Sequence, residues 1–302
     1  MLTENNIGNT KMVKLHHLVS SQSASVYVKM EDNDFGSVKS RIAWQMIRDA
    51  EENGVLTPGS GQTLIEASGG NTGAGLAAIA IPRGYNVFLV IPDNFSQLKI
   101  DICIARGATV LLSDSSLGRD SHVKKTEELL RQHPEFVNLN QFSNPSNPKA
   151  HYLHTGVEIL NSLDKRIHVF VSCAGSGGML SGVGQRLKEV NGNRSKIVAV
   201  QPYGCDLLGG KAVPHIIEGT TLGFLPPVFD TSVIDDVVDV TADEVRATLK
   251  NLVRVEGLFV GYSSAANICS AIKIASKLPH ECVVSTISPD GGRNYPSSIF
   301  NN

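Results

Sequence analysis

Apolar and polar positions along this chain follow two alternating patterns, and each pattern predicts one kind of element. Short apolar runs rich in β-branched residues predict buried strands at 25–29, 63–66, 86–91, 109–112, 168–172, 196–201 and 282–287. Apolar residues at helical spacing predict helices at 38–53, 73–81, 96–106, 121–133, 155–163, 179–190, 242–256 and 265–278. Because strands and helices alternate almost throughout, the sequence predicts an α/β protein with mainly parallel sheets covered on both faces.

A polar loop at residues 140–148 interrupts this alternation, and asparagine and proline are concentrated at 144–148. We expect this loop to separate two α/β domains with a cleft between them. The smaller domain is predicted to span residues 36–150. The larger domain is predicted to combine residues 1–35 with residues 151–302.

Composition and charge narrow the class of protein. The chain of 302 residues is 41% hydrophobic and has a net charge of −2, which argues against nucleic acid or an anionic membrane as the main partner. Five cysteines are scattered without a CxxC pair, and no histidines pair at a metal-binding spacing. We therefore expect buried thiols in a reducing compartment, with no metal site. No apolar segment suits a signal peptide or a membrane span, so the expected location is cytoplasmic.

Lys39 is the first candidate for chemistry. Polar residues at 31–35 and then Gly36 and Ser37 precede a helical pattern, which places Lys39 in the first turn of a helix. A cation there opposes the partial positive charge of the helix N-terminus, at a cost of about 0.3–1 kcal/mol if exposed. That cost disappears if the amine is neutral, or is bonded as an imine to a carbonyl cofactor. The alternative interpretation is an ordinary exposed lysine.

Two glycine-rich loops connect strands to helices and favour an anionic ligand. The first, at 66–73, carries three side-chain hydrogen-bond donors, Ser68, Asn71 and Thr72, although a simple turn capped by Asn or Thr would also explain it. The second, at 172–179, has three glycines in four residues. It lacks the Gly-Lys-Ser/Thr of a Walker A loop, and the third glycine of a dinucleotide fingerprint would fall at Leu180. A monophosphate cradled by backbone amides fits this second loop better.

In their order and spacing, the motifs of this chain resemble those of the cysteine synthase (O-acetylserine sulfhydrylase) and cystathionine β-synthase family of pyridoxal-phosphate (PLP) enzymes. The resemblance runs from Ile7 to Asp290. It is carried by Gly36–Lys39, Ser68–Gly73, Gln141–Pro145, His154–Ile159, Gly175–Gly178, Glu256-Gly257 and Gly261–Ser264. It implies the tryptophan-synthase-β-like fold (PLP fold type II), with two three-layer α/β/α domains. The smaller would carry a mobile substrate loop, and the larger would bind the cofactor phosphate.

The resemblance also implies roles for individual residues. Lys39 would form the imine with the cofactor and then remove the substrate α-proton. Asn71 would bond the phenolic oxygen of the cofactor, and Ser263 would face its pyridine nitrogen, where a neutral hydroxyl favours elimination over transamination. The implied phosphate-binding residues are Gly175, Ser176, Gly177, Gly178 and Met179. The implied substrate-binding residues are Ser68, Gly69, Gly70, Thr72 and Gln141.

Several positions depart from the family pattern. The family usually has Asp at position 40, Ser at 69, Thr at 179, and Gly at both 221 and 265. This chain has Ser40, Gly69, Met179, Thr221 and Ala265 instead. Because Gly69 and the Thr221-Leu222 pair are expected to border the substrate, they bear on the identity of the substrate more than on that of the cofactor.

The leading interpretation is β-replacement on an activated L-serine, O-acetyl-L-serine or O-phospho-L-serine, through an aminoacrylate intermediate. The expected partners are an amino-acid substrate, a small nucleophile and a second copy of the chain in a homodimer. One alternative is a specialised relative that uses an amine, cyanide or a thiol, such as a diaminopropionate-type synthase. Another is a PLP-dependent lyase of the cysteine desulfhydrase or serine dehydratase kind. A binding subunit without cofactor is disfavoured by Lys39 and by the second glycine loop.

Overall fold

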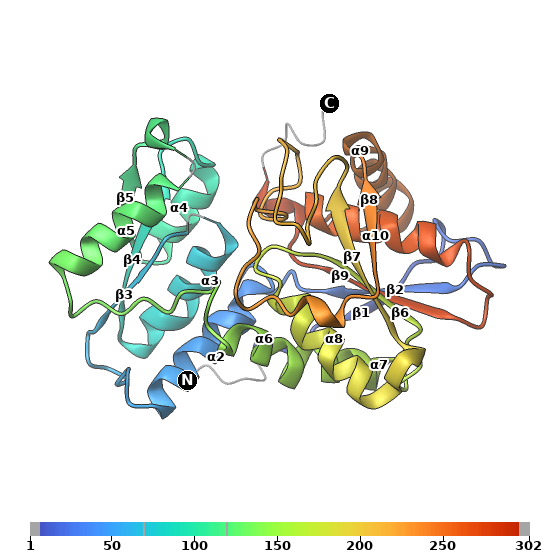
Figure 1. The fold of residues 1–302 in the computed structure, drawn as a ribbon, viewed down its shortest axis with the longest axis horizontal. Coiled ribbons are helices and arrows are strands. Elements are labelled where there is room, and N and C mark those ends of the chain that lie inside the picture. The colour runs from blue at the N-terminus through green and yellow to red at the C-terminus, as the bar shows by residue number, and fades with distance from the viewer. Residues whose placement is uncertain (1–6, 69, 119, 296–302) are drawn as a thin grey trace. The chain divides into compact units, whose positions relative to one another are not determined.

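The computed structural model describes residues 7–68, 70–118 and 120–295, and the chain divides into two compact units. One unit is built mainly from Asp34–Ser146, and the other combines Gly8–Asn33 with Asn147–Asn302. Each unit contains a sheet with helices packed on it (Figure 1). The prediction of an α/β fold with mainly parallel sheets is therefore confirmed. Within the described residues, no helix is both long enough and apolar enough to cross a membrane.

The first unit contains a parallel sheet with the strand order β3-β4-β5. Its strands are β3 (Thr63–Glu66), β4 (Asn86–Pro92) and β5 (Thr109–Ser113). Its helices are α2 (Lys39–Glu52), α3 (Asn71–Ala80), α4 (Gln97–Ala105) and α5 (Ser121–Gln132). Helix α2 packs against α3, and α3, α4 and α5 pack against the strands. The apolar runs predicted from the sequence form the strands, of which β3 and β4 are largely buried, whereas β5 is mostly half-buried or exposed.

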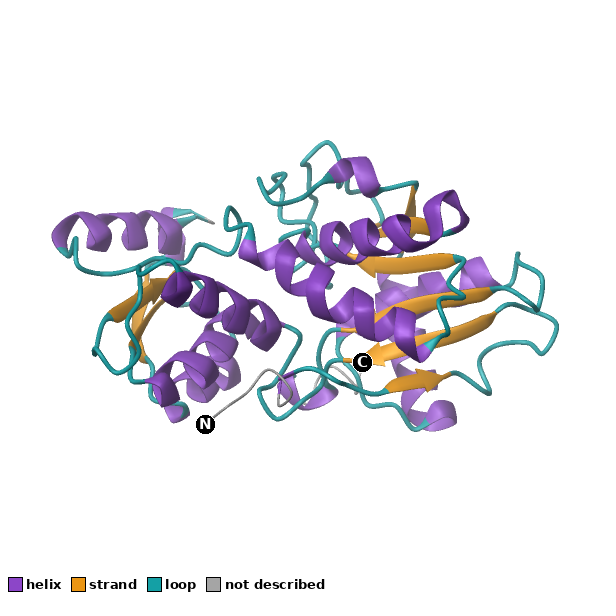
Figure 2. Ribbon diagram, turned by 90° about the horizontal axis from the view of Figure 1, so that it is seen from below, coloured by secondary structure: helices purple, strands orange, loops and turns teal. Residues whose placement is uncertain are grey.

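The second unit contains a six-stranded sheet with the order β1-β2-β9-β6-β7-β8, in which only the β1–β2 pair is antiparallel. Its strands are β1 (Met12–Lys14), β2 (Ser25–Met30), β6 (Val169–Cys173), β7 (Lys196–Pro202), β8 (Asp236–Val240) and β9 (Val283–Ser288). Its helices are α7 (Gly156–Ser162), α8 (Gly178–Asn191), α9 (Ala242–Asn251) and α10 (Tyr262–Ala275). The strands lie side by side in Figure 2 as they do in Figure 1.

Helices cover both faces of the larger sheet. Figure 1 shows α7 and α8 on one side of the strands and α9 and α10 on the other. Each side has its own apolar core. One core includes Leu249 and Ile268 from α9 and α10, and the other includes Ile159 and Leu187 from α7 and α8. The loop between β6 and α8 is thereby anchored at both ends in buried structure.

The structure also contains elements that the pattern did not predict. Within the expected polar loop 140–148, a short helix α6 (Ser146–Ala150) forms. Asn144 Oδ1 accepts a hydrogen bond from the Ser146 amide at 2.9 Å, and Ser146 Oγ donates to Asp49 Oδ2 at 2.6 Å. Helix α9 ends at Asn251, where a wider turn, Leu252–Glu256, replaces the end of the expected helix 242–256.

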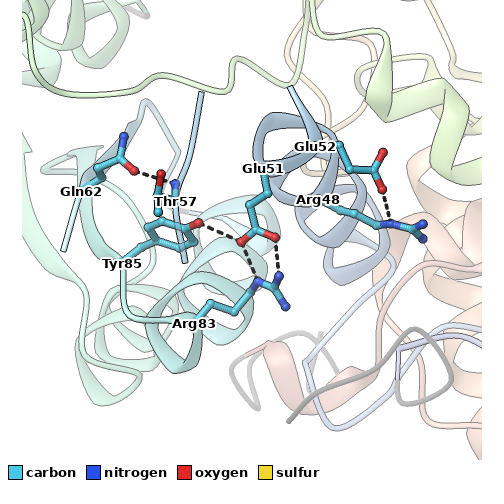
Figure 3. Close-up of polar contacts among 7 residues, drawn as sticks. All are labelled: Arg48, Glu51, Glu52, Thr57, Gln62, Arg83 and Tyr85. Carbon is cyan, nitrogen blue, oxygen red and sulfur yellow. Dashed lines mark hydrogen bonds and ion pairs between the residues drawn. The ribbon is translucent and has the colours of Figure 1, made fainter. Parts of the chain in front are cut away.

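A polar cluster fixes the C-terminal half of α2 (Figure 3). Glu51 accepts hydrogen bonds from Arg83 Nε at 2.9 Å, from Arg83 Nη2, and from the Tyr85 hydroxyl at 2.8 Å. The Arg83 guanidinium also lies 5.1 Å from the centre of the Trp44 ring. Glu51 and Trp44 are on α2, and their partners Arg83 and Tyr85 lie in the segment before β4. The cluster therefore connects α2, the helix that begins with Lys39, to this segment.

Candidate active site

Lys39 is the first residue of α2, as the sequence predicted. The preceding turn uses Gly36 at φ +101°, and Ser37 Oγ accepts a hydrogen bond from the Lys39 amide at 3.2 Å. No acidic residue lies in the first turn of α2 to neutralise the lysine. Burial lowers the pKa of the Lys39 amine from 10.5 to about 8. A nucleophile or proton acceptor must be uncharged, so this shift favours chemistry at Lys39.

Close packing fixes the backbone around Lys39. A Cβ atom at Gly75 on α3 would lie 3.1 Å from the Lys39 carbonyl carbon, a tight contact that glycine avoids where the two helices approach each other. Arg106 Nη1 donates to the carbonyl oxygen of Phe35 at 2.9 Å and to that of Ala74 at 2.7 Å. The guanidinium therefore connects the turn before the lysine to α3.

The first glycine loop leads from β3 into α3, which begins at Asn71. Gly70 is the N-cap and no side chain caps the helix, so the alternative explanation of this loop, a turn capped by Asn or Thr, is wrong. A Cβ atom at Gly73 would lie 2.3 Å from the Ser68 carbonyl oxygen, which explains the need for glycine inside the helix. The uncapped amides at the start of α3 suit a carboxylate. Gly69, predicted to bind substrate, lies outside the described residues.

Two of the predicted substrate-binding residues contact each other. Thr72 Oγ1 donates to Gln141 Oε1 at 2.7 Å. The backbone of Gln141 is held in turn by Glu66 at the end of β3, whose carboxylate accepts from the amides of Asn140 at 3.2 Å and Gln141 at 3.4 Å. The structure thus brings Thr72 and Gln141 together through hydrogen bonds that begin at Glu66.

Glu66 is a candidate that sequence reasoning missed. Its side chain is buried, and burial raises its pKa to about 7, although the amides of Gln141 and Asn140 oppose the rise. The only signal in the sequence was a carboxylate at the end of a strand, directly before the glycine loop. Burial and the partners of that carboxylate depend on the fold, so the sequence could not assign its role.

The second glycine loop lies between β6 and α8. Helix α8 begins at Gly178, its N-cap Gly177 has φ +81°, and no side chain caps it. A Cβ atom at any of three loop glycines would collide with a neighbour, at 2.4 Å from Gly219 O for Gly175, 2.3 Å from Phe229 Cβ for Gly177, and 2.1 Å from Asn147 Oδ1 for Gly178. The loop is therefore a tight backbone cradle at a helix N-terminus, which is the arrangement that binds phosphate groups.

The other two predicted phosphate-loop residues differ in what their side chains do. Ser176 is buried, and its Oγ accepts a hydrogen bond from Asn147 Nδ2 at 2.9 Å. Met179 lies in the first turn of α8 and packs against the apolar core formed by α7 and α8. A thioether offers no hydrogen-bond donor, so Met179 has only its backbone amide to offer an anion.

Ser263 and Ser264 lie in the first turn of α10 and are both buried. Ser264 Oγ donates to the Asp290 carbonyl oxygen at 3.2 Å and accepts from Ser288 Oγ at 2.9 Å. No hydrogen bond to the Ser263 hydroxyl is found among the described residues. Of the two serines, Ser263 is therefore the one whose hydroxyl is available to a ligand. Ala265, where the family usually has glycine, is fully buried.

The described residues fit pyridoxal phosphate. A monophosphate matches the backbone cradle before α8, and an aldehyde matches a lysine whose pKa is lowered to about 8. The Ser263 hydroxyl can serve a neutral ring nitrogen. Residues 3–290 match the profile of a family described as pyridoxal-phosphate dependent enzymes.

This chain belongs to that family.

Known proteins support the assignment along the whole chain. A probable cysteine synthase of Bacillus subtilis (strain 168) is 38% identical over 297 residues, which cover 97% of this chain and 94% of the relative. The crystal structure of an O-ureido-L-serine synthase is 36% identical, has a TM-score of 0.93, and is matched over 100% of this chain and 96% of its own. An O-acetylserine-dependent cystathionine β-synthase of Helicobacter pylori is 35% identical, with a TM-score of 0.90 over 98% of both chains.

These similarities confirm three predictions. They confirm the resemblance to the cysteine synthase and cystathionine β-synthase group, and the tryptophan-synthase-β-like fold. They also confirm a PLP-dependent enzyme of the β-replacement type. The roles of the individual site residues remain predictions.

Proposed function

We propose that this protein replaces the β-substituent of an activated L-serine with a small nucleophile, and that O-acetyl-L-serine is its amino-acid substrate. The observation that carries the proposal is Lys39, a lysine at the start of α2 whose pKa is lowered to about 8. Such an amine can bond a carbonyl cofactor and accept a proton. The cysteine synthases and O-acetylserine-dependent enzymes similar to this chain support the choice of substrate.

Bound pyridoxal phosphate supplies a conjugated ring that accepts electron density from the substrate α-carbon. Around it, the residues of this chain would bind and orient. The backbone amides of 175–179 would hold the phosphate, and Asn71 would fix the tilt of the ring through the phenolic oxygen. The Ser263 hydroxyl would face the ring nitrogen without carrying a charge, which leaves the nitrogen largely unprotonated.

The substrate would be held by its carboxylate. Ser68, Thr72 and Gln141 offer hydrogen-bonding side chains, and the uncapped start of α3 offers backbone amides. Each neutral hydrogen bond contributes only about 1 kcal/mol, so several must act together. The Lys39 amine would then take the proton from the α-carbon.

A second candidate is a specialised relative whose nucleophile is larger than sulfide. The similarity to an O-ureido-L-serine synthase supports it. The departures at Gly69 and Thr221 support it too, because both alter positions expected to border the substrate. A third candidate is a lyase that releases the β-substituent without replacing it, and the similarity to a hydrogen sulfide-producing enzyme of Fusobacterium nucleatum (34% identical, TM-score 0.91) supports it. Measuring pyruvate distinguishes the lyase from the other two.

We further propose that the protein works as a cytoplasmic homodimer. All five cysteines are free thiols and four of them are buried, as expected for a reducing compartment. Several large apolar side chains of the second unit are exposed, among them Leu208, Leu225 and Phe259. Such side chains are suitable for burial in a subunit contact.

Reductive trapping tests the role of Lys39. Borohydride treatment of the PLP-loaded protein should place the pyridoxyl group on Lys39 in a peptide map. Lys39→Ala should lose the adduct and lower kcat/KM with O-acetyl-L-serine and sulfide by roughly 10²- to 10⁴-fold. Lys99→Ala removes another buried lysine and is the matched control, which should retain the adduct. An adduct on any other lysine would refute the assignment.

Product analysis tests the reaction itself. With O-acetyl-L-serine and sulfide, the expected product is L-cysteine. Pyruvate formed at the same rate with and without sulfide would favour the lyase instead. Cysteine formation much slower than replacement by a larger nucleophile would favour the specialised relative.

A further inference from the structure

Thr221 combines two unfavourable features in the second unit. Its backbone has φ +44°, a left-handed conformation that is an outlier for a β-branched residue. Its side chain is only 3% exposed, and Oγ1 has no hydrogen-bond partner among the described residues. Strained backbone and unpaired buried hydroxyls both destabilise a fold, and together they are typical of functional positions.

Thr221 lies directly against the phosphate loop. Its backbone amide donates to the Ala174 carbonyl oxygen at 2.9 Å. Two residues before it, the Gly219 carbonyl oxygen is close enough to Gly175 to exclude a Cβ atom there. The backbone of residues 219–221 is therefore next to the backbone that we propose to hold the cofactor.

The preceding residue offers a natural comparison. Thr220 is buried to a similar degree, 6% exposed against 3% for Thr221. Its Oγ1 donates to the Ile217 carbonyl oxygen at 3.0 Å, so its hydroxyl is satisfied within the protein. Of these two threonines, Thr221 is the one whose buried hydroxyl has no partner among the described residues.

We infer that Thr221 determines substrate specificity, its hydroxyl donating a hydrogen bond to the oxygen-bearing substituent on the β-carbon of the substrate. The inference rests on the proposed function. The phosphate is assigned to the loop amides and the carboxylate to the residues around α3, so the acyl group of an activated serine is the polar part still without a partner. Glycine would adopt this backbone without strain, which indicates that the threonine side chain serves a purpose of its own.

Thermal unfolding of variants at the two threonines tests whether the Thr221 hydroxyl lacks a hydrogen-bond partner within the protein. In the PLP-loaded enzyme without substrate, Thr221→Val should raise Tm by about 2 °C because it removes an unpaired buried polar group. Thr220→Val breaks a hydrogen bond and should lower Tm. A fall in Tm for both variants would overturn the inference, since it would show that the Thr221 hydroxyl is bonded within the protein.

A pair of substrates tests the assignment to the β-substituent. O-acetyl-L-serine carries a carbonyl oxygen on its β-substituent, whereas β-chloro-L-alanine carries only chlorine. Thr221→Val should lower kcat/KM about tenfold for O-acetyl-L-serine and by less than about twofold for β-chloro-L-alanine. Thr221→Ser keeps the hydroxyl, so it should keep the ratio of kcat/KM for O-acetyl-L-serine to kcat/KM for β-chloro-L-alanine near that of the wild type. Equal losses on both substrates would overturn the inference.

Two further results separate this inference from its alternatives. The dissociation constant of pyridoxal phosphate should be unchanged in Thr221→Val. A tenfold rise would assign the hydroxyl to the cofactor phosphate and overturn the inference. A wild-type enzyme that consumes neither substrate would overturn the proposed function and the substrate assignment with it, whatever the unfolding data show.

Discussion

The position of Lys39 in the first turn of a helix identifies it as a candidate for chemistry. A lysine in the first turn of a helix is electrostatically unfavourable, and in the structure burial disfavours its charged form further and lowers its pKa to about 8. The sequence predicted both the position and the need for an uncharged form. It could do so because the helix start follows from Gly36 and the apolar spacing, which are local features.

The lowered pKa predicts a pH-dependent effect of replacing Lys39 in the cofactor-free protein. The pKa of Lys39 is about 8 in the folded protein and 10.5, the ordinary lysine value, in the unfolded chain. The unfolded chain therefore binds more protons between these values, so the contribution of Lys39 to stability rises with pH across this range. Lys39→Met should therefore raise Tm at pH 7, and the gain should disappear near pH 10.5. Differential scanning fluorimetry between pH 7 and 10.5 measures the difference in Tm between Lys39→Met and the wild type.

The exposed Lys277 at the end of α10 provides the control, and Lys277→Met should change Tm little at any pH. A Lys39→Met variant that is less stable than wild type at pH 7 would contradict the prediction. So would a difference in Tm that stays constant with pH.

Other residue roles could not be predicted because they depend on distant partners. Ser263 and Ser264 are neighbours of the same type, so the choice of Ser263 depended on the family resemblance; the contacts of Ser264 with Asp290 and Ser288 are visible only in the structure. Burial raises the pKa of Glu66, and the amides that oppose this rise lie more than seventy residues along the chain. The orphaned hydroxyl of Thr221 is likewise a property of the folded loop.

At the scale of elements, the sequence predicted most helices and strands because their apolar patterns are long and regular. The exceptions have weak patterns. Strand β8 reads Asp-Val-Val-Asp-Val and lies at the edge of its sheet, so it lacks a continuous apolar run. Helix α6 is only five residues long and depends on the polar contacts of Ser146 for its start.

The polar cluster on α2 predicts unequal effects for two adjacent glutamates (Figure 3). Glu51 is largely buried with Arg83 and Tyr85, whereas Glu52 pairs with Arg48 at the surface. Glu51→Ala should destabilise the protein by about 2 kcal/mol or more, since it leaves two partly buried donors without an acceptor. Glu52→Ala should cost less than about 0.5 kcal/mol.

Urea denaturation at pH 7 measures both free energies of unfolding. The two changes alter helix propensity in the same way, so their difference reports the contacts alone. Equal destabilisation by the two variants would show that the Glu51 cluster does not hold α2.

At the scale of the whole molecule, the order of strands joins distant parts of the chain. Strand β2, near the N-terminus, pairs in parallel with β9 over Ser25–Met30 and Val283–Ser288. Local patterns contain no information about such pairing, so periodicity alone could not predict it. The assignment of the N-terminal segment to the larger domain in the sequence analysis depended on the polar break and on the family resemblance.

This pairing predicts that the larger sheet needs both ends of the chain. A chain reduced to residues 34–302 lacks β1 and β2 and leaves β9 as an unpaired edge, which promotes aggregation. We expect it in the insoluble fraction on expression, and we expect co-expression with residues 1–33 to recover soluble, PLP-binding protein. Soluble, PLP-binding 34–302 without the N-terminal fragment would contradict the prediction.

The helix that begins with Lys39 also contains Trp44, the only tryptophan of the chain. Five residues of helix separate the two by about 7.5 Å along the axis. The indole is mostly buried and lies against the Arg83 guanidinium. All tryptophan fluorescence of this protein therefore originates from the helix that begins with Lys39, which gives the enzyme an intrinsic optical probe of that helix without any label.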